Sequence, residues 1–157
     1  MEFKEYMKDW ILNDLSSPVA ALNNFSKCPY AKTAFLENKV HFFEISDYPE
    51  IDTIVSAWDN EKMEVAVIKL PPITSNYITT LVDNLNERYI PDDFIFLDDH
   101  VDNEERMNEI VFNNGKYNVL FLQRKSKLDL STKKLEKLGY YKNWTSDYYE
   151  EVVGWRS

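Results

Sequence analysis

The chain has 157 residues, of which 44% are hydrophobic and 15% aromatic, so it can form one domain with a substantial core and is not disordered throughout. Its net charge of −9 opposes general attraction to nucleic acid or to anionic membranes, and we expect neither as a partner. No apolar run approaches the roughly 20 residues that a membrane-spanning helix needs.

Cysteine usage and the first residues bear on the compartment. Cys28 is the only cysteine, so no internal disulfide can form. The opening residues, Met-Glu-Phe-Lys-Glu-Tyr, lack the basic and apolar sections of a signal peptide. We therefore predict a cytoplasmic protein. The three glycines and the many Asn, Lys, Ile and Tyr residues favour an AT-rich bacterial or viral genome, and in the viral case the location is the host cytoplasm.

The first third of the chain reads as helices followed by a strand. Apolar residues from Phe3 to Leu15 recur at helical spacing, which predicts an amphipathic helix over 2–15. The remaining elements expected here are a short helix through Leu22, a helix over 29–37 and a strand over 40–45.

Later segments alternate between helix and strand. We expect a helix after Tyr48-Pro49, a strand over 63–70, a helix begun by Thr74 or Ser75 and ending at Tyr89, a strand over 94–97, a hairpin of 110–112 with 117–122, and a helix over 131–138 that Gly139 stops. Val119 to Leu122 is apolar on both faces, which is typical of a central strand. The aromatic tail should pack back on the domain.

These elements predict an α+β fold over 1–157, a single domain with a mixed four- to five-stranded sheet and packed helices. A thioredoxin-like arrangement and a ferredoxin-like split sheet both remain open.

Cys28 is the candidate reactive group. It stands directly before Pro29, where a helix is expected to begin, and unpaired N–H groups at a helix start favour a thiolate. Lys27 and Lys32 could add positive charge. The alternative is that Cys28 is a small apolar residue packed ahead of a helix.

Two resemblances include this cysteine. Cys28-Pro29-Tyr30, Lys32, Ala34, Leu36 and the run Val40 to Ile45 resemble the active-site helix and following strand of glutaredoxins. That resemblance implies that Cys28 is the thiol of a one-cysteine redox protein acting through a mixed disulfide with glutathione. Ala31 stands where the second cysteine of the dithiol motif would be, and a glutaredoxin has a strand before the cysteine.

The second resemblance is to a bacterial family of domains of unknown function with a Leu-x-x-Cys-Pro-Phe-Ala-Lys motif after an N-terminal Trp. Trp10, Leu22 and the run Cys28 to Lys32 follow that order. This family implies no activity.

A metal site is the other candidate. Asp98, His100 and Asp102 offer carboxylate and imidazole ligands in a strongly acidic stretch, although a solvated acidic loop explains the same residues. No cofactor is expected. The sequence thus predicts a one-cysteine thiol protein using Cys28. The alternative is a non-catalytic, acidic, partner-binding protein of viral or bacterial origin, with the tail aromatics as contacts to a protein partner.

Overall fold

A four-stranded mixed sheet lies at the centre of the computed structural model, which describes residues 2–156. Its strand order is β1-β2-β6-β3, with β1 and β2 parallel and the other neighbours antiparallel. The strands are β1 (Val40–Glu44), β2 (Val65–Lys69), β3 (Phe94–Asp99) and β6 (Val119–Arg124). A separate two-stranded ribbon joins β4 (Arg106–Met107) to β5 (Ile110–Val111).

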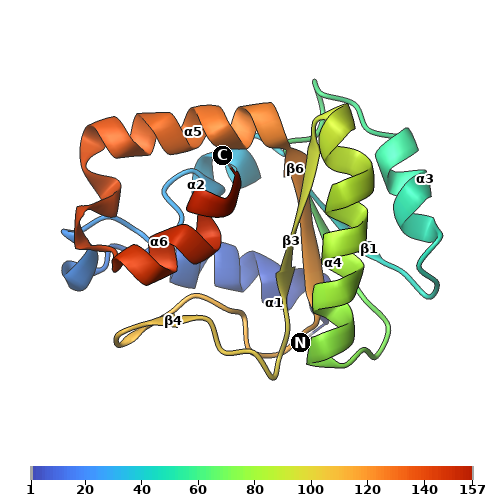
Figure 1. The fold of residues 1–157 in the computed structure, drawn as a ribbon, viewed down its shortest axis with the longest axis horizontal. Helices are drawn as coiled ribbons and strands as arrows, with labels where there is room; N and C mark the ends of the chain where they lie inside the picture. Colours follow the sequence, from blue (N-terminus) through green and yellow to red (C-terminus); the bar gives the residue numbers. More distant parts are fainter. Residues whose placement is uncertain (1, 157) are drawn as a thin grey trace.

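Helices cover both faces of this sheet. The helical segments of residues 2–156 are α1 (Phe3–Asp9), the π-helix η1 (Trp10–Leu15), η2 (Ala20–Leu22), α2 (Ala31–Leu36), α3 (Glu50–Ser56), α4 (Ser75–Tyr89), η3 (Ile90–Asp92), α5 (Lys125–Leu138), η4 (Tyr140–Asn143), α6 (Ser146–Val152) and η5 (Gly154–Arg156). Figure 1 shows α3 and α4 on one side of the sheet, with α1, α2, α5 and α6 on the other.

Alternation along the strands sends apolar side chains into two cores. Ile68, Leu120 and Leu122 pack with α3 and α4. Val67 and Val119, on the opposite face, pack with α1 and η1. A third cluster joins the β4–β5 ribbon to α6 and η2 through Leu22, Met107, Ile110 and Tyr148. α6, η2 and the β4–β5 ribbon therefore share a core that is separate from the two cores on the sheet.

The predicted α+β class is confirmed, as are most of its elements. Within residues 2–156 the main sheet has four strands, and β6 is an inner strand with apolar side chains on both faces, as its sequence indicates. The Thr74 hydroxyl accepts a hydrogen bond from Tyr77 N at 3.2 Å and caps α4. Tyr140 and Tyr148 are buried, so the aromatic tail does pack back.

The predicted hairpin is wrong. β5 pairs with β4, whereas β6 pairs with β2 and β3. The chain does reverse at Asn114 and Gly115, with Gly115 at a φ of +76°. The strand that follows, β6, has β2 and β3 as its two neighbours, so β5 cannot pair with it.

The sheet differs from the expected ferredoxin-like arrangement and from the strand order that the glutaredoxin resemblance implies. β1 and β2 are direct neighbours joined through α3, which is not the split unit of a ferredoxin-like sheet. Within residues 2–156, every strand of the main sheet follows Cys28, whereas the glutaredoxin resemblance implies a strand ahead of it. The described residues form a single domain; positions 1 and 157 of the predicted range 1–157 lie outside them.

None of the helices in residues 2–156 combines the length and the apolar character that a membrane crossing demands.

Candidate functional site

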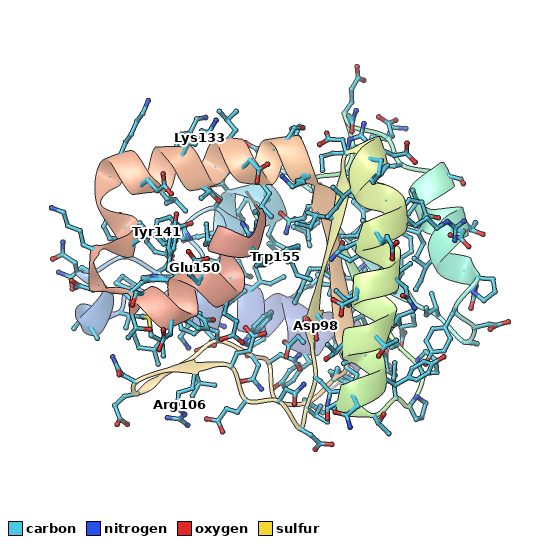
Figure 2. All side chains as sticks on the ribbon, viewed as in Figure 1. Asp98, Arg106, Lys133, Tyr141, Glu150 and Trp155 are labelled. Carbon is cyan, nitrogen blue, oxygen red and sulfur yellow. The ribbon has the colours of Figure 1, made fainter. Side chains whose placement is uncertain are left out.

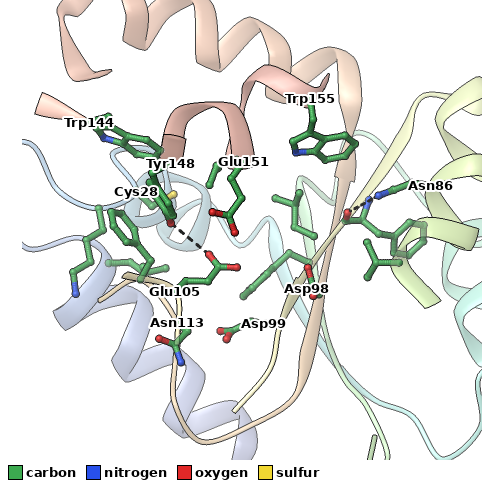
Figure 3. A pocket seen from close by; sticks show the side chains of 18 of the residues that line it. Cys28, Asn86, Asp98, Asp99, Glu105, Asn113, Trp144, Tyr148, Glu151 and Trp155 are labelled. Carbon is green, nitrogen blue, oxygen red and sulfur yellow. Dashed lines mark hydrogen bonds between the residues drawn. The ribbon is translucent and has the colours of Figure 1, made fainter. Parts of the chain in front are cut away.

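A cavity of about 600 Å³ lies between the end of β3, the β4–β5 ribbon and the C-terminal helices. Asp98 and Asp99 reach it from β3, Glu105 from the residue before β4, and Glu151 from α6. Figure 3 shows these side chains around one space, with Trp155 above it. The cavity therefore collects carboxylates from segments that are far apart in the chain.

Asp99 is the most buried of these acids, with 4% of its surface exposed. Its Oδ2 accepts hydrogen bonds from Asn114 N at 2.9 Å and from Asn114 Nδ2 at 2.6 Å. Its Oδ1 is buried and has no partner. Burial raises the pKa of Asp99, although the Asn114 bonds act in the opposite direction. Because a buried carboxylate oxygen without a partner is costly, a donor from a bound molecule or a water would stabilise it.

Glu105 lies beside Asp99 in the cavity wall. Burial, followed by the charges of Asp99, Asp98 and Glu151, raises its pKa to about 7. Its Oε2 accepts a weak hydrogen bond from the Tyr148 hydroxyl at 3.4 Å. Burial, followed by the charge of Asp83, also raises the pKa of Asp98. These carboxyls disfavour one another's ionisation, so a cation among them would be stabilised.

The positive charge in the lining of this cavity is neutralised by an ion pair. Among residues 2–156, Lys27 is the one lysine or arginine that lines this cavity, against five acids: Asp83, Asp98, Asp99, Glu105 and Glu151. Its Nζ bonds both carboxylate oxygens of Asp14, at 2.9 and 3.1 Å. The cavity thus carries an excess of negative charge.

Aromatic rings form the rest of the wall. Trp144 packs against Phe112 and Tyr148, with ring centroids 5.7 and 4.9 Å apart. Trp10 stacks on Phe121 at 6.0 Å. Trp155 is 44% exposed and lines the same cavity. Aromatic side chains beside carboxylates form a suitable environment for an organic cation.

A second cavity of about 300 Å³ adjoins the first. Trp10, Cys28, Phe121 and Trp144 line both. Its own wall is mostly apolar, but it includes Arg156.

The buried polar atoms without partners gather around these two cavities. Within residues 2–156 they are Trp10 Nε1, Asp99 Oδ1, Asn113 Oδ1, Trp144 Nε1 and Arg156 Nε. Each belongs to a residue that lines one or both cavities. Such atoms are rare in packed cores, and their concentration here indicates a place for bound groups.

Cys28 lies where the two cavities meet. It lies three residues before Ala31, where α2 begins, and it is exposed. Burial raises the pKa of its thiol, and main-chain hydrogen bonding at Ala31 and Tyr30 opposes that rise without cancelling it. Of the two predicted activating lysines, Lys27 is paired with Asp14 and Lys32 is exposed on α2.

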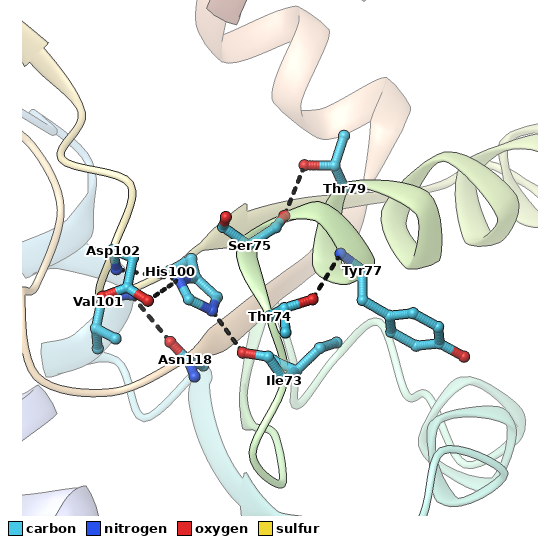
Figure 4. Close-up of polar contacts among 9 residues, drawn as sticks. All are labelled: Ile73, Thr74, Ser75, Tyr77, Thr79, His100, Val101, Asp102 and Asn118. Atoms are coloured by element: carbon cyan, nitrogen blue, oxygen red, sulfur yellow. Dashed lines mark hydrogen bonds and ion pairs between the residues drawn. The ribbon is translucent and has the colours of Figure 1, made fainter.

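The predicted metal site is not assembled. His100 Nε2 bonds Ile73 O at 2.6 Å, and its Nδ1 accepts from Asp102 N at 3.0 Å, so both ring nitrogens are occupied (Figure 4). Asp98 lines the large cavity, and the Asp102 side chain is 79% exposed. Among residues 2–156, no three His, Cys, Asp or Glu side chains are arranged to hold a metal ion. His100 instead joins the end of β3 to the segment before α4.

Sequence reasoning missed Glu105, Glu151 and Arg156 as site residues, and it considered Asp99 only as a possible metal ligand beside His100. The pair Asp98-Asp99 directly after apolar β3 residues was an available signal, since charged residues at a strand end often face a cavity. Nothing in the sequence brings α6 to that strand end.

No family model, curated protein or solved structure matches the chain.

Proposed function

We propose that this is a non-catalytic binding protein whose larger cavity holds the protonated amino group of a small organic molecule. The observation that carries the proposal is the buried, unpartnered Oδ1 of Asp99 in a cavity with four further carboxylates. It develops the binding alternative from the sequence, with the aromatic tail supplying contacts through Trp144, Tyr148 and Trp155.

An organic cation suits this wall better than a metal ion does. The acids are spread around about 600 Å³, within the range of volumes typical of small-molecule sites. An ammonium group could donate to Asp99 Oδ1 while its carbon atoms contact the rings of Trp144 and Trp155.

Direct titration tests the proposal. Benzylamine and its neutral counterpart benzyl alcohol are titrated by calorimetry at about pH 8, where Glu105, with its pKa of about 7, is mostly ionised and the amine is protonated. We expect measurable binding of benzylamine and at least about tenfold weaker binding of the alcohol, because hydrogen bonds to charged groups contribute roughly 1.5–3 kcal/mol.

Matched variants locate the binding. Asp99→Asn keeps an acceptor for Asn114 and removes the charge, so benzylamine affinity should fall at least about tenfold. Glu109→Gln removes the same charge from an exposed residue outside the cavity and should leave affinity within about twofold. Equal binding of the alcohol, or an Asp99→Asn variant that binds as well as the wild type, would overturn the proposal.

The thiol function stays a second proposal. Its support is that Cys28 faces a cavity and has main-chain hydrogen bonds at Tyr30 and Ala31 that favour the thiolate. The pKa of Cys28 is raised, and Lys27 forms an ion pair with Asp14 instead of stabilising a thiolate. Both facts favour the binding function. A mixed disulfide with glutathione would belong to the thiol proposal only. We propose the cytoplasm, or the host cytoplasm for a viral protein, as the location in either case.

A further inference from the structure

Two basic residues of the described chain line the smaller cavity, Lys27 and Arg156, and Lys27 is paired with Asp14. Arg156 is therefore the residue that can offer this cavity a positive charge. The guanidinium forms a hydrogen bond from Nη1 to Thr132 Oγ1 at 3.5 Å, and its Nε is buried without a partner. Within residues 2–156 no carboxylate forms an ion pair with it. A guanidinium held among apolar side chains is stabilised by an anion that accepts its planar set of donors.

The wall around Arg156 is otherwise largely apolar. Leu128 and Leu135 from α5, Val67 from β2 and Ile11 from η1 all line the smaller cavity. A molecule that fills it would bury hydrocarbon there and would place only its end group on Arg156.

The two cavities adjoin, because eight of the described residues line both of them, Trp10 and Trp144 included. Each indole has a buried N–H without a partner. A molecule that extends from one cavity into the other passes these rings. Each charged end of this molecule must then lie near lining residues of opposite charge. Its positive end lies among the acids, and its negative end lies at Arg156.

We infer that the ligand is an amino acid in the broad chemical sense: an amine in the larger cavity, a carboxylate on Arg156 in the smaller one, and an apolar spacer along the side chains that line both, such as Trp10 and Trp144. This inference rests on the proposed function and specifies its ligand class. The carboxylate of the ligand binds Arg156, whereas its amine binds Asp99. The two contacts can therefore be tested separately.

Three probes of equal chain length test the inference: 6-aminohexanoate, hexylamine and hexanoate. In the wild type, 6-aminohexanoate should bind at least about tenfold more tightly than hexylamine, and hexanoate should bind most weakly because the larger cavity repels anions. A spacer series from 4-aminobutanoate to 8-aminooctanoate should show one preferred length, set by the separation of Asp99 and Arg156.

Arg156→Met should abolish the advantage of 6-aminohexanoate over hexylamine while hexylamine affinity stays within about threefold. Arg156→Lys keeps the charge, loses the planar donor set, and should keep part of the advantage. Lys133→Met is the matched control, because Lys133 is exposed on the outer side of α5 and lines neither cavity (Figure 2). Retained hexylamine binding verifies that each variant is folded.

The outcomes separate the inference from the proposed function. Hexylamine that binds through Asp99 with no gain from the carboxylate overturns the inference alone, as does an Arg156→Met variant that keeps the gain. Failure of every amine to bind overturns the proposed function and this inference with it.

Discussion

Asn86 on α4 pairs with both main-chain polar groups of Phe96 on β3. Its Nδ2 donates to Phe96 O at 3.0 Å, and Phe96 N donates to its Oδ1 at 2.7 Å. β3 is an edge strand, so the amide of Asn86 takes the place of a neighbouring strand at this residue. The contact fixes the strand end that carries Asp98 and Asp99 into the cavity.

Replacing Asn86 should therefore destabilise the fold. Asn86→Ala leaves a buried N–H and a buried carbonyl without partners, and we expect it to lower the free energy of unfolding by about 2–4 kcal/mol. Urea denaturation measures the change. Asn84→Ala, on the exposed side of the same helix, is the control and should stay within about 0.5 kcal/mol of the wild type. A similar cost for both variants would mean that the Phe96 contact contributes little.

Local sequence patterns predicted the parts of the fold that depend on neighbouring residues. α4 has apolar side chains at helical spacing and a Thr74 cap, and the structure places its start and end as predicted. β6 was recognised as central because both of its faces are apolar.

Features that depend on distant residues were missed. α5 begins at Lys125 rather than at 131, because the Asp93 carboxylate accepts hydrogen bonds from Ser126 N at 2.8 Å and Ser126 Oγ at 2.6 Å. Asp93 lies 33 positions earlier in the chain. The cavity also depends on residues that are far apart in the chain. Its acids come from β3, α4, α6 and the segment before β4, and no sequence periodicity relates those segments.

Gly139 ends α5 in the left-handed conformation, with a φ of +81°. Gly139→Ala should lower stability by about 1–2 kcal/mol, because a β-carbon disfavours this backbone conformation. Gly139→Asn should cost clearly less, since asparagine adopts the left-handed region more readily. Thermal and urea unfolding of the pair measure the difference. Equal costs would point to steric contact with the Lys142 side chain, 3.4 Å from the position of an added β-carbon, instead of backbone strain.

Stability should fall as the pH rises toward neutral. The folded state holds the Glu105 proton more tightly than the unfolded chain does, since the pKa is about 7 in the fold and about 4.3 when unperturbed. Between these values the folded form binds more protons, so the free energy of unfolding decreases as pH increases, by up to roughly 3.5 kcal/mol from this group.

Glu105→Gln should remove that part of the pH dependence. The facing groups are Asp98, Asp99, Glu151 and the Tyr148 hydroxyl, and the raised pKa values of Asp98 and Asp99 leave a smaller decline in the same direction. Urea denaturation at a series of pH values measures the slopes. Glu109→Gln, outside the cavity, should keep the wild-type slope. An unchanged slope in Glu105→Gln would show that folding does not raise the pKa of Glu105.

Cys28 should behave as a neutral thiol at physiological pH. Burial raises its pKa, and the charge of Lys27 is neutralised by Asp14 at 2.9 Å. The rate of alkylation by iodoacetamide, measured against pH, should therefore have its midpoint above the ordinary thiol value of about 8.5. The urea-unfolded chain gives the reference midpoint for the same cysteine. A midpoint below neutral pH in the folded protein would mean that the amides at the start of α2 outweigh burial, and the thiol function would then replace amine binding as the better proposal.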